Sequence, residues 1–187
     1  MIDHPELFVL RHGETVWNQE GRFQGLKDSP LTEKGQAQAL AQKKLLGALE
    51  CIPDNVCVSP LGRALQTARL ALGPNKDLIV DSRLQEIDFG TWEGSTREEI
   101  KNQIDYAFED GTWNFRSPGG ETFEMISKRV LAFLRDLTEP AIIVTHGTTS
   151  IVLRGLCIGL DQTEILKLPK DQGCIYHLLN GKETILQ

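Results

Sequence analysis

The sequence has no long apolar run and no excess of basic residues. No stretch is long enough to cross a bilayer, and no basic segment followed by an apolar one marks a signal peptide at the start of the chain. Lys and Arg together number 20 and Asp and Glu 26, which gives a formal net charge of -6. This sign argues against general binding to nucleic acid or to an anionic membrane surface. We therefore expect a cytoplasmic protein that binds neither nucleic acid nor membrane.

The sequence also has few cysteines and no pattern typical of a metal site. The four cysteines, Cys51, Cys57, Cys157 and Cys174, have no C-x-x-C spacing, and we interpret them as reduced thiols. No P-loop and no D-x-D-type group of carboxylates is present. We expect no metal and no other cofactor. In an acidic chain of this kind, an anionic substrate would need cations placed close to it.

No linker rich in proline, glycine or serine divides the 187 residues, so the sequence predicts a single domain over residues 1–187. Apolar strand patterns alternate with amphipathic helix patterns along the chain. This alternation predicts an α/β fold, a three-layer α/β/α sandwich around a mostly parallel sheet. Strands are predicted near residues 7–10, 55–59, 78–80 and 141–145, with a strand or edge hairpin after 173. Helices are predicted near 32–49, with the stripe Ala37, Ala41, Leu45 and Leu49 facing the core, and near 61–72, 96–110, 121–137 and 148–158.

Two of the predicted strands end in the same way. Residues 7–10 lead into Arg11-His12-Gly13, and residues 141–145 lead into His146-Gly147. Arg63 follows the strand near 55–59, in the first turn of the next helix. Ligands of open α/β sheets bind at the carboxyl ends of the strands, so the two histidines and two arginines are predicted to meet there. The alternative is that each histidine is an ordinary surface or core residue.

Three loops could complete such a site. The loop at residues 16–25 holds Asn18 and Gln24, which are candidates for hydrogen bonds to phosphate or substrate, or else ordinary exposed residues. The loop at 84–94 holds three carboxylates among aromatic residues, a setting that disfavours a charged carboxylate and suits a general acid. These carboxylates could instead cap turns or pair with arginines. The loop at 111–120, through Trp113, Phe115 and Arg116, could cover the pocket and select substrates.

These motifs together resemble the histidine phosphatase superfamily, which includes the cofactor-dependent phosphoglycerate mutases. The resemblance covers nearly the whole chain, and several motifs in the right order are more specific than any one of them. The residues that carry it are Leu10–Thr15 with Trp17-Asn18, Gln24-Gly25, Pro30–Gly35, Ser59–Thr67, Glu86–Gly94 and Thr145-His146-Gly147.

The resemblance implies a phosphoglycerate mutase-like fold and a role for each main residue. It implies that His12 is the nucleophile and forms a phosphohistidine, and that Arg11, Arg63 and His146 bind the transferring phosphoryl group. It makes Glu86 the proton donor to the leaving oxygen. Arginine forks match phosphate oxygens, and a neutral imidazole can attack phosphorus. Substrate-binding roles are expected for Asn18, Gln24, Gly25 and Gly147.

Two features favour the phosphatase branch over the mutases. Glu86 is followed by Ile87-Asp88-Phe89-Gly90, where the mutases would have an Arg-x-Tyr-Gly pattern, and no long basic insertion precedes Ser117. We therefore predict a metal-independent, histidine acid phosphatase-type phosphomonoesterase that acts on a small phosphorylated metabolite. The alternatives are a phosphoglycerate mutase-type transfer and a non-catalytic module that binds a phosphorylated ligand. The sequence leaves the substrate and the oligomeric state open.

One further pattern offers a competing nucleophile. Cys57 and Arg63 have the C-x5-R spacing of cysteine-dependent phosphatases. That loop aims backbone N–H groups at phosphate, and Pro60 has none to offer. Cys57 also lies between two valines, where a buried and inert thiol is usual. The spacing is therefore expected to be a coincidence.

Overall fold

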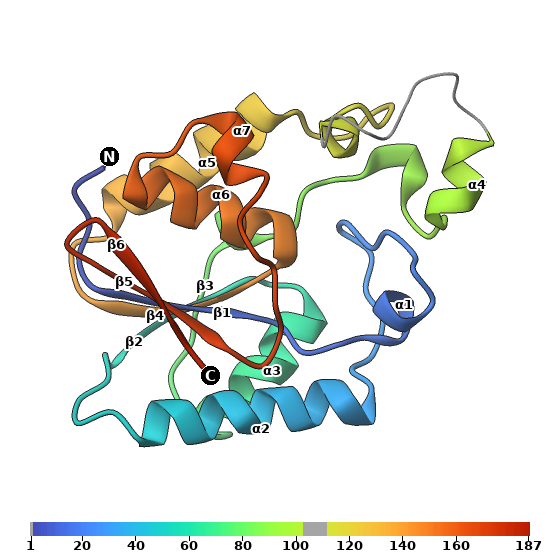
Figure 1. The fold of residues 1–187 in the computed structure, drawn as a ribbon. Coiled ribbons are helices and arrows are strands. Elements are labelled where there is room, and N and C mark those ends of the chain that lie inside the picture. The colour runs from blue at the N-terminus through green and yellow to red at the C-terminus, as the bar shows by residue number, and fades with distance from the viewer. Residues whose placement is uncertain (1, 103–111) are drawn as a thin grey trace.

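The computed structural model of the chain describes residues 2–102 and 112–187, which form a six-stranded mixed sheet covered by helices (Figure 1). The strand order is β3-β2-β4-β1-β5-β6. Four neighbouring strands are parallel, and β5 runs antiparallel to β1 and β6 antiparallel to β5. The strands are β1 (Leu7–Arg11), β2 (Asn55–Val58), β3 (Ile79–Val80), β4 (Ala141–Thr145), β5 (Ile175–Leu179) and β6 (Lys182–Leu186).

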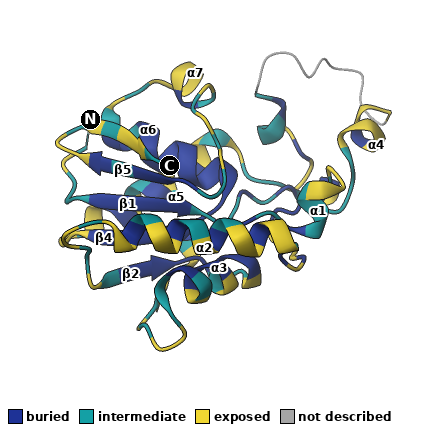
Figure 2. Ribbon diagram, turned by 60° about the horizontal axis from the view of Figure 1, so that its bottom comes forward, coloured by how far each residue is buried: buried dark blue, intermediate teal, exposed yellow. Residues whose placement is uncertain are grey.

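The central strands are buried on both faces, which explains their continuous apolar sequences. Side chains alternate between faces, so Leu7 and Val9 of β1 enter one core while Phe8 and Leu10 enter the other. The first core packs against α5 (Phe123–Asp136) and α6 (Gly147–Ile158), and the second against α2 (Glu33–Gly47) and α3 (Gly62–Leu72). The result is the predicted α/β/α sandwich, with dark buried strands between helices that are exposed on their outer sides (Figure 2).

Short helices lie in the connections. They are α1 (Val16–Gln19), α4 (Arg97–Lys101) and α7 (Gln162–Ile165), with 3-10 turns at Ser82–Leu84, Gly90–Trp92 and Trp113–Phe115. Of the helix predicted near 96–110, the structure describes α4, and the rest of that prediction lies outside the described residues. The predicted terminal hairpin is confirmed as β5 and β6 at the sheet edge. No helix in the described part of the chain is both long and apolar enough to cross a membrane.

The predicted core stripe of α2 is confirmed only in part. Thr32 caps the helix as predicted, and Leu45 and Leu49 of the stripe pack against the core while partly buried. The fully buried residues of the helix are Gly35, Ala39, Gln42 and Leu46, and Ala37 is exposed. A polar residue is buried because the side-chain amide of Gln42 donates hydrogen bonds to the backbone oxygens of Arg11 and Cys174, both at 3.0 Å. Helix α2 thus supports the strand end that precedes the candidate site.

Candidate active site

Adjacent strand ends bring the two histidines together. Strands β1 and β4 pair in parallel register with Arg11 opposite Thr145, and each histidine is the next residue along its chain. The rings of His12 and His146 lie with their centroids 5.1 Å apart and tilted by 58°. The structure brings these two residues together at the carboxyl ends of neighbouring strands, as the sequence predicted. The same edge holds Arg63, which lies in the first turn of α3 after β2.

The hydrogen bonds of His12 define its tautomer. Its Nδ1 lies 2.7 Å from the carbonyl oxygen of Gly13, which can only accept, so Nδ1 carries the proton. Its Nε2 accepts a hydrogen bond from the Nε of Arg63 at 3.3 Å, so Nε2 holds a lone pair. Burial lowers the pKa of His12 well below its ordinary value, and the charges of Arg11 and Arg63 lower it further. His12 is therefore a neutral imidazole with its Nε2 available as a nucleophile.

Arg63 is fixed by the loop that follows α1. Its guanidinium donates to the backbone oxygens of Gly25 and Lys27, at 2.8 and 2.7 Å, and pairs with Asp28 at 2.9 Å. The carboxylate of Asp28 also accepts from the backbone N–H of Arg63. The arginine is fully buried apart from its pocket edge, and these partners hold its planar fork in one orientation.

Arg11 has hydrogen-bonding capacity to spare. One of its terminal nitrogens donates to the backbone oxygen of Lys170, while its Nε is buried with no partner among the described residues. Gly147 lets this guanidinium lie close, because a Cβ at that position would be 3.4 Å from the Cζ of Arg11. Unlike Arg63, Arg11 has N–H groups left for a ligand.

His146 is buried beside His12 and does not line the cavity described below. Its Nε2 is 2.7 Å from the hydroxyl oxygen of Ser59, and its Nδ1 is buried with no hydrogen-bond partner in the described part of the chain. Burial lowers the pKa of His146 well below its ordinary value, with Arg63 as the next cause. A buried polar atom without a partner is uncommon and is typical of a group whose partner arrives with a ligand.

Glu86 has a more polar setting than the apolar one predicted for it. Its carboxylate lies at the N-terminus of α6, where Oε1 accepts from the backbone N–H groups of Thr148 and Thr149, both at 3.1 Å. Among the residues that the structure describes, Oε2 accepts only from the Thr148 N–H, at 3.2 Å. The helix terminus fixes the carboxyl group, and Oε2 keeps a lone pair free toward the pocket.

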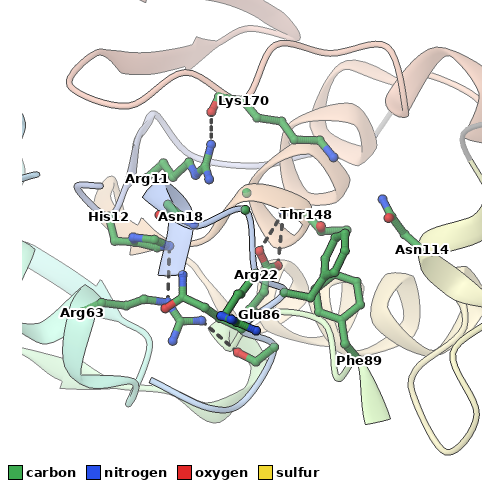
Figure 3. Close-up of a pocket in the computed structure, with 15 residues that line it drawn as sticks. Arg11, His12, Asn18, Arg22, Arg63, Glu86, Phe89, Asn114, Thr148 and Lys170 are labelled. Atoms are coloured by element: carbon green, nitrogen blue, oxygen red, sulfur yellow. Dashed lines mark hydrogen bonds between the residues drawn. The ribbon is translucent and has the colours of Figure 1, made fainter. Parts of the chain in front are cut away.

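These residues surround a cavity of about 270 Å³ (Figure 3). The volume suits a small ligand and not a polymer segment. Its lining comprises Arg11, His12, Asn18, Gly21, Arg22, Phe23, Gln24, Gly25, Arg63, Glu86, Phe89, Asn114, Gly147, Thr148 and Lys170.

The four residues expected to bind substrate all line this cavity, although two of them have other partners. The side-chain amide of Gln24 bonds to Thr15 and Ser29, and the oxygen of Asn18 accepts from the Gln172 amide. Both amides therefore brace the loops around the site. Gly25 and Gly147 approach Arg63 and Arg11 with their backbones.

The loop at 111–120 reaches the pocket through a different residue from the three predicted. Trp113 is buried against Phe23, with ring centroids 5.1 Å apart, and Phe115 packs on Phe123. Asn114 lines the cavity between them. Sequence reasoning also missed Asp28, Ser59 and Lys170. Asp28 and Lys170 lie in irregular segments that no periodic pattern marks, and Ser59, which directly follows β2, was given no role of its own.

Cys57 has none of the properties of a nucleophile. Its side chain is buried in the core on the α5 side of the sheet, away from the lining of the cavity. Burial raises the pKa of its thiol to about 11. The expectation that the C-x5-R spacing is a coincidence fits this placement. All four cysteines are free thiols, as predicted.

Among the described residues, no three His, Cys, Asp or Glu side chains are grouped as a metal site requires. The charges of the site come instead from arginines and a lysine. Arginine forks bind oxyanions without a metal, and a neutral imidazole beside them can attack an electrophile. The fold and the site thus define an α/β protein with a compact pocket that is built around a histidine and lined by cationic side chains.

Comparison with known proteins gives the family. Residues 7–185 match the model of the histidine phosphatase superfamily, branch 1, and the chain belongs to this superfamily. A relative from Salmonella choleraesuis, named probable phosphoglycerate mutase GpmB, is 35% identical over 176 residues, which cover 88% of this chain and 76% of that protein.

Solved structures agree with this assignment. The alpha-ribazole phosphatase from Shigella flexneri superposes with a TM-score of 0.80 at 29% identity, covering 97% of this chain and 94% of that one. Bacillus stearothermophilus YhfR superposes with a TM-score of 0.81 at 32% identity, covering 97% and 95%. The chain therefore has relatives named both as a phosphatase and as a mutase, and the predicted fold is confirmed.

Proposed function

We propose that the protein is a metal-independent phosphomonoesterase that acts on a small phosphorylated metabolite through a phosphohistidine. The observation that carries the proposal is the state of His12. It is neutral, its Nδ1 proton is held by Gly13, and its Nε2 lone pair lies at the pocket beside Arg63. Phosphoryl transfer depends mainly on positioning and charge stabilisation, and the two arginines supply both.

The first step forms one bond and breaks one. The Nε2 lone pair of His12 attacks phosphorus, the ester P–O bond breaks, and the leaving oxygen takes a proton from the carboxyl group of Glu86. The free N–H groups of Arg11 are available to phosphoryl oxygens, whereas His146, which does not line the cavity, lies next to the His12 ring. Arg63 exchanges its bond to His12 for a bond to phosphate as the new N–P bond forms.

The second step returns the site to its starting state. A water attacks the phosphohistidine, Glu86 takes its proton, and the N–P bond breaks to release inorganic phosphate. Oε2 of Glu86 is suited to both transfers because it accepts one hydrogen bond from the described part of the chain. The amides of α6 hold the same carboxyl group throughout, so acid and base are a single fixed residue.

A phosphoglycerate mutase-type transfer is the second candidate, supported by the 35% identity to a protein named probable phosphoglycerate mutase. The two reactions share the phosphohistidine and differ in its acceptor. Incubation with 3-phosphoglycerate and catalytic 2,3-bisphosphoglycerate separates them. A hydrolase releases inorganic phosphate, and a mutase yields 2-phosphoglycerate.

The proposal is tested by trapping the intermediate. Rapid acid-free quenching after mixing with 4-nitrophenyl phosphate and EDTA should yield protein that carries one acid-labile phosphoryl group on His12. His12→Ala should lose this group and reduce turnover by about a thousandfold or more. His4→Gln is the matched control, because His4 does not line the cavity and should leave both intact. Turnover without a phosphoenzyme, or turnover that EDTA abolishes, would contradict the proposal.

A further inference from the structure

Lys170 is a cation of the cavity that the proposed chemistry does not use. It lies in the connection between α7 and β5, and its side chain lines the cavity with Arg11, Glu86 and Thr148. Figure 3 shows the Lys170 side chain extending across the pocket, with its amine on the side where Asn114 lies. Lys170 belongs to a segment that is distant in sequence from every motif of the site.

The backbone around Lys170 is held firmly in place. A fully buried arginine, Arg154, stacks on the Tyr176 ring and ties the segment to α6. The anchored backbone fixes the point from which the lysine side chain enters the cavity. Four hydrogen bonds fix the segment: Arg154 to the Pro169 oxygen, Arg11 to the Lys170 oxygen, the Asp171 N–H to the Tyr176 hydroxyl and Gln172 to the His12 oxygen.

The amine of Lys170 has no partner of its own. It makes no hydrogen bond and no ion pair with any residue that the structure describes. Burial lowers the pKa of Lys170, while the charge of Glu86 acts in the opposite direction. Removing an ammonium group from water is unfavourable unless an anion compensates. Two other cations of the cavity differ, since Arg63 pairs with Asp28 and Arg22 with Glu20.

The direction of its side chain places Lys170 at the leaving-group end of the site. Lys170 lines the cavity together with Glu86, and Figure 3 shows its amine turned away from His12 and toward the side of Asn114. Glu86 is the residue proposed to protonate the leaving oxygen, so a cation beside it faces the alcohol part of the substrate. The transferring phosphoryl group has Arg11 and Arg63 already.

The side of the cavity toward which the Lys170 amine extends has a second unused polar group. The Oδ1 of Asn114 is buried without a hydrogen-bond partner in residues 2–102 and 112–187. An amide oxygen accepts from a hydroxyl group and not from a second anion. An alcohol portion that carries both an anionic group and a hydroxyl would therefore satisfy Lys170 and Asn114 together.

We propose that Lys170 is a specificity residue that binds an anionic group on the alcohol part of the substrate. The substrates favoured by the site are then small phosphomonoesters with a second negative charge, either a carboxylate or a second phosphate. This inference rests on the proposed phosphomonoesterase activity. It adds the substrate class that this particular chain selects.

Matched pairs of substrates test it. Glycerol 1-phosphate and 3-phosphoglycerate differ by a carboxylate, and fructose 6-phosphate and fructose 1,6-bisphosphate differ by a phosphate. The wild-type protein should favour the more anionic member of at least one pair by about tenfold to a hundredfold in kcat/KM, since a bond to a charged group is strong. The pair with the larger ratio identifies which anion the site takes.

Variants of Lys170 assign the preference to this residue. Lys170→Met should bring the ratio within the preferred pair close to one, and Lys170→Arg should retain most of it. Lys167→Met is the matched control, because Lys167 is an exposed lysine of the same connection and does not line the cavity. Its ratio should equal that of the wild-type protein.

The outcomes separate this inference from the activity on which it rests. If no phosphomonoester is hydrolysed, the proposed function fails. If the wild-type protein hydrolyses both members of each pair equally well, the activity stands and the role of Lys170 is refuted. The role is refuted too if Lys170→Met lowers kcat/KM by the same factor for both substrates of a pair. The lysine would then act on the phosphoryl group that both substrates share.

Discussion

The Nε of Arg63 donates a hydrogen bond to the Nε2 of His12 across 3.3 Å. A guanidinium donor on this atom has two consequences. It leaves no room for a proton on Nε2, so the imidazole stays neutral, and it holds the lone pair in a fixed direction until a ligand arrives. Asp28 fixes the arginine in turn. The chain from Asp28 through Arg63 to His12 thus preorganises the proposed nucleophile.

The first prediction concerns the acid side of the pH–rate profile. The lowered pKa of His12 keeps the imidazole neutral as the pH falls through 6.5, so kcat/KM should show no loss from His12 near that pH. Arg63→Gln removes a cation that lowers this pKa. The pKa of His12 should then rise toward its ordinary value, and the acid limb should move to higher pH.

The measurement is the position of the limb in kcat/KM, with the His12 ring followed by NMR over the same range. Arg69→Gln is the control, because Arg69 lies on the same helix and bonds to the backbone oxygens of Pro74 and Lys76. It removes the same charge from outside the site, and the limb should stay in place. If the acid limb of the Arg63→Gln variant moved to lower pH instead, the charge of Arg63 would not be lowering the pKa of His12, and the prediction would be wrong.

The second prediction concerns Glu86 and the leaving group. Glu86→Gln keeps an oxygen for the Thr148 and Thr149 amides and removes the transferable proton. Alkyl phosphates have poor leaving groups, so kcat/KM for them should fall by about a hundredfold or more, whereas aryl phosphates should lose much less. Asp88→Asn is the control, since Asp88 caps the Gly90 amide outside the cavity lining. Equal losses for both ester types would exclude Glu86 as the acid.

The third prediction compares two buried serines. Ser59→Ala removes the hydroxyl that bonds to His146, leaving a second ring nitrogen of that histidine unpaired at a cost of about 1–3 kcal/mol of stability. Loss of ring orientation should also lower kcat/KM. Ser150→Ala is the control, because the Ser150 hydroxyl has no partner in the described chain and its removal should cost little. Denaturant unfolding and steady-state kinetics measure both effects, and equal costs for the two variants would contradict the assignment.

The residues that sequence reasoning found share one property. His12 and His146 directly follow buried strands, Arg63 lies at the start of the helix after another, and parallel strands deliver their carboxyl ends to the same edge. A continuous apolar run is visible in a sequence, and so is the polar residue that ends it. The core of the sheet and the meeting of these side chains could therefore be predicted.

The residues that sequence reasoning missed reach the site by tertiary contacts. Lys170 is placed by Arg154 and Tyr176, and Asn114 by the packing of Trp113 on Phe23. The core stripe of α2 was only partly predicted for a related reason, since Gln42 is buried by its bonds to distant backbone oxygens. Partners that lie far away in the chain leave no periodic trace, so such contacts are visible only in the folded structure.

The fourth prediction concerns the contact between α2 and the loop after His12. A Cβ on Gly13 would lie 2.1 Å from the backbone oxygen of Gly35, an impossible distance that only a backbone shift can relieve. Gly13→Ala should therefore cost about 3 kcal/mol or more of stability. It should also disturb His12, whose Nδ1 bonds to the Gly13 oxygen.

Gly47→Ala is the matched control, because a Cβ there meets nothing within 4 Å. Alanine is the better helix former, so that variant should gain about 0.5–1 kcal/mol. Unfolding of the two variants in urea measures the difference, and a Gly13→Ala protein as stable as the wild type would show that this close approach is absent in solution.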